Sequence, residues 1–535
     1  MLRPMTSPSM LRFLGGFRRF LLLLTALLSA AGSRTDAAPS KPNILFILSD
    51  DHAAQAISAY GSPWNKTPGL DRLAREGMRL DRCYAVNSIC TPSRASILTG
   101  QYSHRNGVPV FNNLDPSATT VAHRLRQAGY HTAMLGKWHL GSEPQGFDEW
   151  NILPGQGRYQ DPVFYDRDGH RIYRGHVSDV TTDLAIRMLE KRPKDKPFFL
   201  MCHHKAPHRN WSPAERHRLQ FAGEEIAEPA TLRDDYRGRS DALRQQRQSV
   251  FRDLTRRDLK LVPPTDLPAK GVGAWLDEVP DEVVVPSATG PLTLRGEALD
   301  RWKYQRYMQD YLACVQGVDD GVGRLLDWLD SQGLRENTVV IYTSDQGFFL
   351  GEHGLYDKRF MYEPSIRMPF LIRWPGVIVA GSTSEALSIN CDFAPTFLEM
   401  AGAPAAPEMQ GRSLVPILKG RRPADWRSGF YYRYYHDPGH HDTRAHYGIR
   451  TDTHKLIHYW KLDQWEMYDL VADPQEMTNR VTDPSMAAVL TDLKSRLVAE
   501  RQRLGDTNQF ANLLPRDTVD QRPKQMDRKH PDSEL

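Results

Sequence analysis

Two apolar runs, each followed closely by a polar pair, constrain the fold of this 535-residue chain more than any other feature. Asn43–Ser49 reads NILFILS and precedes Asp50–Asp51, and Thr338–Thr343 reads TVVIYT and precedes Asp345–Gln346. A near-continuous apolar run without helical spacing is typical of a strand buried on both faces of a parallel sheet. Such sheets place their sites at the carboxyl ends of strands, where both polar pairs are predicted to lie.

The segments between and beside these runs alternate between strand and helix patterns. Further strands are predicted at Tyr130–Leu135, Phe198–Cys202 and Phe370–Arg373, and helices at Leu70–Arg79, Val121–Ala128 and Leu299–Leu329. Strands that alternate with helices indicate an α/β fold, in which a mainly parallel central sheet is flanked by helices.

Shifts in composition predict the domain boundaries. Residues 39–425 form the main domain, and within it residues 222–297 are charged and rich in proline, which we interpret as an insertion at the surface or beside the site. Residues 426–510 are aromatic and strand-like and end in a helix, Met486–Leu504. They predict a smaller C-terminal α+β domain with an antiparallel sheet. The polar residues 511–535 are expected to form a frayed tail.

The first 38 residues differ from the rest of the chain. Arg12, Arg18 and Arg19 precede the apolar block Phe20–Leu28, and small residues follow it. This layout predicts a signal peptide over 1–38 and a secreted or periplasmic protein; a buried or interfacial helix is the alternative. The leader carries the whole formal charge of +4, so the charge does not indicate nucleic-acid binding. No later apolar run is long enough to span a membrane, so no stable membrane insertion is expected after the leader is removed.

The chain contains five cysteines, an odd number for an exported protein. At least one of them is therefore unpaired or chemically special, and Cys90 is our candidate. Pairing among the other four remains open; they are Cys83, Cys202, Cys314 and Cys391.

Cys90 begins the segment Cys90–Arg94, which reads CTPSR and matches the pattern C-x-P-S-R completely. With the two polar pairs, this segment resembles the sulfatase family, the formylglycine-dependent branch of the alkaline phosphatase-like superfamily. The resemblance runs from Lys41 to about Asn479 and includes WEMYDL at Trp465–Leu470. It implies that residues 39–425 are the catalytic domain. It also implies that a formylglycine-generating or equivalent maturation enzyme oxidises Cys90 to an aldehyde.

The family chemistry assigns roles to several side chains. The aldehyde hydrates to a diol, one hydroxyl attacks sulfur, and loss of a proton from the other hydroxyl releases sulfate. The resemblance implies that Arg94 holds the diol, His139 takes its proton, Lys137 and Lys358 bind sulfate, and His208 protonates the departing alcohol. Taken singly, such lysines and histidines are more often solvated loop residues, and His203 and His204 compete with His208 for its role. No cysteine or carboxylate at typical ligand spacing supports a zinc site in this histidine cluster.

A metal site is predicted from the residue types alone. Asp50, Asp51, Asp345 and the amide oxygen of Gln346 form an all-oxygen set, which suits a hard cation such as calcium or magnesium. The alternative is that each pair caps the following helix. The resemblance implies calcium, with the modified Cys90 as a further ligand, and many relatives have asparagine or histidine in place of Gln346.

Longer segments narrow the resemblance to carbohydrate sulfatases of the N-acetylglucosamine-6-sulfatase type. These segments are KAPHRNW at Lys205–Trp211, the run from Asp345 to Glu363, and HYGIRT at His446–Thr451. They imply hydrolysis of 6-O-sulfated N-acetylglucosamine in glycosaminoglycans or mucin glycans. Candidate sugar contacts are Arg209, Asn210, Trp211 and His446, for which packing is an equal alternative.

Three other functions remain open at this point. The substrate could be another sulfated sugar, such as a 2-O-sulfated uronate or a sulfated galactose. A phosphatase or phosphodiesterase of the same superfamily would use a serine or threonine nucleophile and two transition metals, which the Cys90 motif disfavours. A glycan-binding protein that has lost catalysis would keep Cys90 unmodified.

Overall fold

The central sheet is built around β1 (Asn43–Ser49), whose residues are all buried. In this computed structural model, which describes Met1 and residues 41–521 and 524–530, ten strands form the sheet. In order across the sheet they are β16 (Ser382–Ser384), β2 (Met78–Leu80), β15 (Phe370–Arg373), β11 (Thr338–Ser344), β1, β8 (Phe198–His203), β4 (His131–Lys137), β5 (Glu149–Leu153), β6 (Val163–Tyr165) and β7 (His170–Ile172). The inner strands, from β11 to β5, run parallel, as the apolar runs predict.

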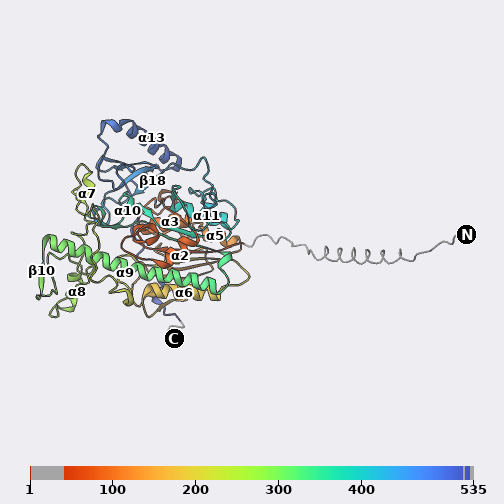
Figure 1. The fold of residues 1–535 in the computed structure, drawn as a ribbon, viewed down its shortest axis with the longest axis horizontal. Coiled ribbons are helices and arrows are strands. Elements are labelled where there is room, and N and C mark those ends of the chain that lie inside the picture. The colour runs from red at the N-terminus through yellow and green to blue at the C-terminus, as the bar shows by residue number, and fades with distance from the viewer. Residues whose placement is uncertain (2–40, 522–523, 531–535) are drawn as a thin grey trace. The chain divides into compact units, whose positions relative to one another are not determined.

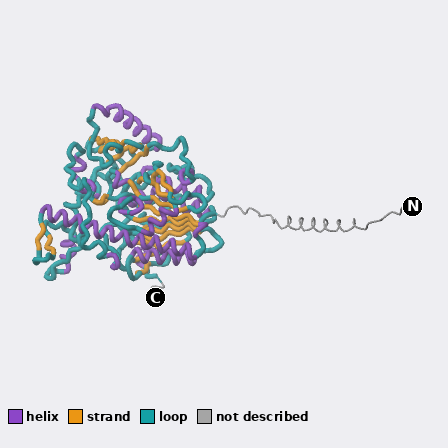
Figure 2. The backbone as a smooth tube through the Cα atoms, viewed as in Figure 1, coloured by secondary structure: helices purple, strands orange, loops and turns teal. Residues whose placement is uncertain are grey.

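Helices cover both faces of this sheet (Figures 1 and 2). Leu45 and Ile47 of β1 pack with α2 (Pro68–Glu76), α6 (Val177–Lys191) and α9 (Gly296–Ser331). The alternate β1 residues pack on the other face, with α3 (Cys90–Thr99), α5 (Val121–Gln127) and α11 (Phe393–Met400). Successive side chains of a strand point to opposite faces, so a run that is apolar throughout needs both layers of helices.

The end of one predicted helix differs in the structure, and the difference has a physical reason. The helix predicted over Leu70–Arg79 ends at Glu76, and the chain continues as β2 beside β15. At Gly77 a Cβ would lie 2.0 Å from the carbonyl oxygen of Ile372, so only glycine permits this approach. The strand predicted at Phe370–Arg373 has those bounds, but it runs antiparallel to β11.

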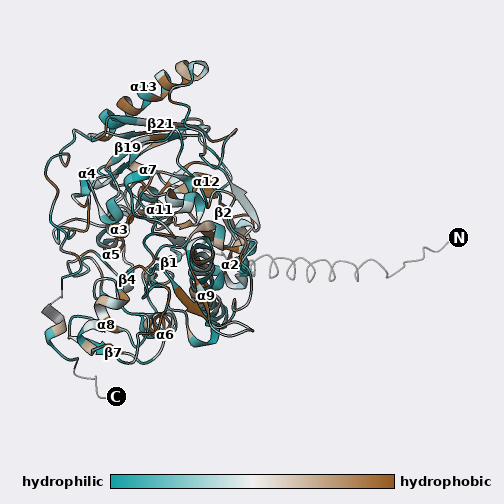
Figure 3. Ribbon diagram, turned by 90° about the vertical axis from the view of Figure 1, so that its left-hand side faces the viewer, coloured by the Kyte–Doolittle hydropathy of each residue, from teal (hydrophilic) through white to brown (hydrophobic). Residues whose placement is uncertain are grey.

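The C-terminal part contains the predicted antiparallel sheet. Its strands are β18 (Gly429–Tyr434), β19 (His446–Thr451), β20 (His454–Tyr459) and β21 (Gln464–Asp469). The helix α13 (Ala487–Leu504) lies against this sheet through Leu493 and Leu497 (Figure 3). This sheet belongs to the same compact unit as the central sheet, Pro42–Leu535.

Two segments contribute to the interior: the insertion, which was expected at the surface or beside the site, and the tail, which was expected to be frayed. The insertion buries apolar side chains in the central core, including Val250, Leu254 and Leu259. In the tail, the backbone N–H groups of Thr518 and Val519 donate to the carbonyl oxygen of Phe111 at 2.9 and 3.0 Å. This part of the tail is therefore packed rather than frayed.

The signal-peptide prediction concerns residues 1–38, of which only Met1 lies within the described residues. Among the residues that the structure describes, no helix has both the length and the apolar character needed to span a bilayer.

All five cysteines are buried and unpaired with one another. The open question of pairing among Cys83, Cys202, Cys314 and Cys391 is thereby answered for the folded chain: none forms a disulfide.

Candidate active site

The two polar pairs meet at the carboxyl edge of the sheet, as predicted. Ser49 and Ser344, the last residues of β1 and β11, are direct partners in the parallel register. Asp50–Asp51 and Asp345–Gln346 therefore leave the sheet side by side, and the Asp51 N–H donates to Asp345 Oδ1 at 3.2 Å. One carboxylate oxygen from each of the three aspartates lies within 4.8 Å of the others.

These buried oxygens fit a hard cation. Burial, with the nearby Asp50 charge, raises the pKa of Asp345 well above its ordinary value, and burial raises that of Asp51 to about 6. Burial acts in the same direction on Asp50, but Lys137 and other cations outweigh it and hold its pKa well below the usual range. Asp50 Oδ1 and Gln346 Oε1 are buried without a hydrogen-bond partner among the described residues. An oxygen-rich cluster with unsatisfied acceptors is the donor set that calcium or magnesium prefers.

Three cationic side chains surround the carboxylates. Lys137 donates to Asp50 Oδ2, and to Gln156 Oε1 at 2.6 Å. Arg94 Nε donates to Asp345 Oδ2 at 2.9 Å. Lys358 Nζ likewise donates to the third carboxylate, that of Asp51. All three cations are almost fully buried, so their positive charge acts in a medium of low dielectric constant.

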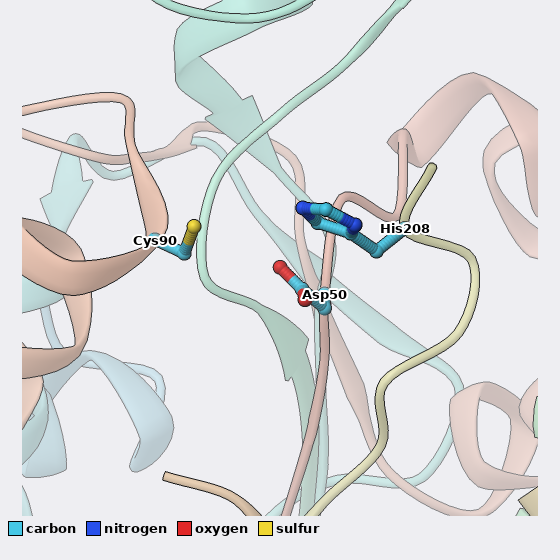
Figure 4. Close-up of side chains that lie close together, drawn as sticks. All are labelled: Asp50, Cys90 and His208. Carbon is cyan, nitrogen blue, oxygen red and sulfur yellow. The ribbon is translucent and has the colours of Figure 1, made fainter. Parts of the chain in front are cut away.

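Cys90 is the first residue of α3, and its side chain faces the same space as those of Asp50 and His208 (Figure 4). Its sulfur lies within 4.8 Å of a carboxylate oxygen of Asp50 and a ring nitrogen of His208. Burial raises the pKa of the thiol, so an unmodified Cys90 is a weak nucleophile at neutral pH.

The two histidines expected in catalysis are held differently. His208 Nδ1–H donates to the Arg209 carbonyl oxygen at 2.7 Å, and Nε2 lies 3.8 Å from Asp51 Oδ2. Burial lowers the pKa of His208 well below 6.5, so the ring is neutral. His139 has no exposed side-chain surface, and its Nε2 lies 3.1 Å from Asp520 Oδ1. Burial, with Lys137 nearby, lowers the pKa of His139 to about 4.

His203 and His204, which competed with His208 in the sequence, do not line the cavity. His203 Nδ1 lies 3.1 Å from the Lys137 carbonyl oxygen and 3.2 Å from Arg94 Nη1. His204 lies beside Gly321 of α9. Only His208 of the three reaches the space in front of Cys90.

A cavity of about 410 Å³ opens above this cluster, and Cys90, His208 and Lys358 line its floor. Its walls include residues that no sequence pattern identified: Gln156, Asp357, Arg359, His440, His441 and the segment Asp517–Gln521. Asp357 and Arg359 flank Lys358 in the sequence, and this proximity was the one local feature that could have identified them. No local pattern could have placed the tail segment in the cavity wall, because its partners are hundreds of residues away along the chain.

The four expected sugar contacts separate into two groups. Arg209 lines the cavity, and Asn210 lies in a shallower hollow beside it. Trp211 is wholly buried against Tyr307, so it offers no face to a sugar, and the expectation is corrected. His446 is equally buried, stacked on Phe360, and is corrected for the same reason.

Buried carboxylates ringed by cations, beside a helix-borne cysteine at the carboxyl edge of an α/β sheet, are typical of hydrolases that act on anionic esters. Comparison with known families agrees. A sequence model described as Sulfatase matches residues 42–403, and one described as N-sulphoglucosamine sulphohydrolase, C-terminal, matches residues 351–503. The chain belongs to the sulfatase family, so it is a sulfuric ester hydrolase.

Individual relatives are similar over most of their length. An N-acetylglucosamine-6-O-sulfatase of Bacteroides thetaiotaomicron is 49% identical over 486 residues, which cover 86% of each chain. An N-acetylglucosamine-6-sulfatase of Capra hircus is 28% identical over 75% of this chain and 66% of its own. The structure of BT4656 in complex with its substrate D-glucosamine-2-N,6-O-disulfate has a TM-score of 0.82 and 45% identity, and covers 89% of this chain and 100% of that one. A phosphonate monoester hydrolase of Agrobacterium radiobacter, at 22% identity and a TM-score of 0.65, shares the fold alone.

Proposed function

We propose that this sulfatase removes the 6-O-sulfate group from N-acetylglucosamine, or from N-sulfated glucosamine, in glycosaminoglycans or mucin glycans. The observation that carries the proposal is the arrangement of the cavity: Lys358 lies at its floor, Lys137 is buried beside Asp50, and the walls carry hydrogen-bonding side chains. The names of the similar proteins, which include a complex with a 6-O-sulfated glucosamine, support this sugar over a uronate or galactose.

The proposal includes formylglycine at Cys90 and one calcium ion at Asp50, Asp51, Asp345 and Gln346. When hydrated, the aldehyde supplies a hydroxyl that attacks sulfur and a second hydroxyl whose deprotonation releases sulfate. Held by these four side chains, the cation would supply positive charge that favours formation of the nucleophile.

The chain's own residues bind the sulfate and move its protons. Lys137 and Lys358 bind sulfate oxygens and balance the charge that develops on them, at fixed positions that need no reorganisation. Arg94 holds the Asp345 carboxylate and the nucleophile's helix end together. His139 accepts a proton from the nucleophile.

His208 protonates the departing alcohol through Nε2. Its Nδ1–H is already donated to the Arg209 carbonyl oxygen, so Nε2 is the nitrogen left to carry a transferable proton. A sulfate group bound beside Nε2 brings a negative charge, which favours the protonated ring that the free site disfavours.

The test is sulfate release from a panel of sulfated sugars by protein produced with a maturation enzyme. We expect 6-O-sulfated N-acetylglucosamine to be hydrolysed at least tenfold faster than 2-O-sulfated uronates or sulfated galactose, since a misplaced ester lies away from the nucleophile. Binding without release would indicate a glycan-binding protein instead. Elemental analysis should give about one calcium per chain, whereas two zinc ions would favour a phosphatase or phosphodiesterase.

Export through the signal peptide 1–38, to the periplasm or the exterior, is part of the same proposal. The similarity to the family model begins at residue 42, just after this leader. Mass analysis of the protein from its native host should find a mature chain that begins near residue 39. A retained leader would contradict export by cleavage.

A further inference from the structure

The insertion and the C-terminal part of the chain meet at one side of the cavity. His441 bridges two carboxylates: its Nδ1 lies 2.5 Å from Asp253 Oδ2, and its Nε2 lies 2.9 Å from Asp357 Oδ2. The ring of His441 therefore lies between the two carboxylates, with one nitrogen near each. The three side chains expose 15%, 10% and 8% of their surface, so this is a largely desolvated bridge.

The same insertion carboxylate also reaches Arg209, a second residue that lines the cavity, through a tyrosine. Tyr356 Oη donates to Asp253 Oδ2 at 2.6 Å and accepts from Arg209 Nη1 at 2.5 Å. Arg209 is also held by Asp258, another insertion residue, through two hydrogen bonds of 2.9 and 2.6 Å. One short stretch of the insertion, residues 253–258, thus holds two residues that line the cavity, Asp357 through His441 and Arg209 both directly and through Tyr356.

The backbone at these positions indicates that surrounding contacts fix it. Asp357, Arg359 and His441 have φ values of 70°, 92° and 60°, in the left-handed region that residues other than glycine rarely adopt. Such conformations persist where the surrounding structure determines them, and they cluster at functional sites. Arg359 also donates a hydrogen bond to Asp357, and the Arg247 N–H of the insertion donates to the His441 carbonyl oxygen at 2.7 Å.

We propose that Asp253, Asp258 and His441 are positioning residues that fix Asp357 and Arg209 in the sugar-facing wall of the cavity, so that the insertion governs binding of the carbohydrate rather than of the sulfate. This inference rests on the proposed sugar-sulfatase activity. Lys137 is held by Asp50, and Lys358 is held mainly by Asp51, at 2.5 and 2.7 Å, whereas its contact with Asp357 is longer, at 3.4 Å. Disturbing the bridge therefore affects the wall more than the floor.

The test compares two sulfate esters, one of a sugar and one of a phenol that has no sugar. Asp253→Asn keeps the shape of the side chain and removes its charge, and His441→Asn removes the bridge. For each variant we expect kcat/KM on 6-O-sulfated N-acetylglucosamine to fall about 10- to 100-fold, mainly through KM, since small displacements of binding groups have effects of this size. Turnover of 4-nitrophenyl sulfate, which lacks a sugar, should stay within about twofold, because it needs only the floor.

The matched control is Asp277→Asn, an exposed insertion aspartate paired with Arg257 outside the cavity, which should alter neither substrate. Thermal unfolding of each variant checks that the chain is folded; if Asp253→Asn does not fold, His441→Asn and Tyr356→Phe carry the test. Equal losses on both substrates would mean a merely structural role and would overturn the proposal, as would variants that match wild type on both. If wild type hydrolyses a different sulfated sugar, the proposed substrate fails, and the same comparison on that sugar still decides the positioning role.

Discussion

Lys358 Nζ donates to both carboxylate oxygens of Asp51, at 2.5 and 2.7 Å, although 307 positions separate the two residues along the chain. Both side chains are nearly fully buried. The pair therefore joins the segment after β1 to the segment after β11 at the place where the proposed cation and sulfate would meet.

Lys358→Met should abolish sulfate release and destabilise the metal-free protein. Removing one partner of a buried ion pair leaves an uncompensated charge, which typically costs about 3–5 kcal/mol of unfolding free energy. Calcium should restore part of this loss, since a bound cation supplies the missing positive charge. Urea unfolding with and without calcium measures both effects, with Lys66→Met at an exposed position as the control. An unchanged unfolding free energy would contradict the pairing.

Cys90→Ala should remove all sulfate release while leaving the chain folded. The side chain is small and buried, so its loss creates only a small cavity and costs about 1 kcal/mol. Thermal unfolding checks that the variant is folded, and a sulfate-release assay checks that it is inactive. Mass analysis of the wild-type peptide around residue 90 should show the aldehyde; residual turnover by the variant would exclude Cys90 as the nucleophile.

His208→Ala should affect substrates according to their leaving group. A sugar alcohol needs a proton as it departs, whereas 4-nitrophenolate leaves without one. We expect a loss of about 10²–10⁴-fold on the sugar sulfate, the usual range for general acid catalysis, and a much smaller loss on the aryl sulfate. Steady-state kinetics on both substrates measure this difference. Equal losses would argue against the acid role and for sulfate binding alone.

Asp520→Asn should lower kcat without unfolding the protein. The hydrogen bond at one ring nitrogen of a histidine determines which nitrogen carries the hydrogen, and Asp520 is the partner of His139 Nε2. We expect kcat to fall about tenfold, as for other groups that orient a reactive side chain. Asp463→Asn, at an exposed aspartate beside His458, is the matched control. Wild-type kcat in the variant would show that the tail does not orient His139.

Stability should fall as the pH falls from about 6.5 towards 4. Burial lowers the pKa of His204 to about 4, and both of its ring nitrogens lack a partner among the described residues. Between pH 6.5 and 4 the unfolded chain protonates this histidine and the folded chain does not. The contribution of neutral His204 to the unfolding free energy is therefore complete above pH 6.5 and is lost on acidification. It amounts to roughly 3 kcal/mol for one such histidine. The Tm of His204→Leu should depend less on pH than that of wild type or of His454→Leu, and parallel curves would contradict this.

The predictions that the structure confirms came from local sequence patterns. The runs at β1 and β11 are apolar on both faces, so the parallel sheet and the meeting of Asp50–Asp51 with Asp345–Gln346 followed from the sequence. Asp253 and Asp520 were not found, because their partners are distant in sequence and an isolated aspartate has no periodicity. Trp211 was named as a sugar contact with packing as an equal alternative, for a related reason: an aromatic residue beside a catalytic loop has the same local sequence in a core as in a pocket wall.

Cys90 exposes 1% of its surface in the folded chain, and the side chains around it include Asp345 and Lys358, which are synthesised some hundreds of residues later. An enzyme that oxidises this cysteine needs an accessible peptide around it. Under the proposed maturation, the oxidation must therefore take place during synthesis or export, before β11 joins the sheet. A molecule that folds before its cysteine is oxidised keeps the thiol. The specific activity of a preparation will therefore depend on the rate of oxidation relative to the rate of folding in the cell that made it.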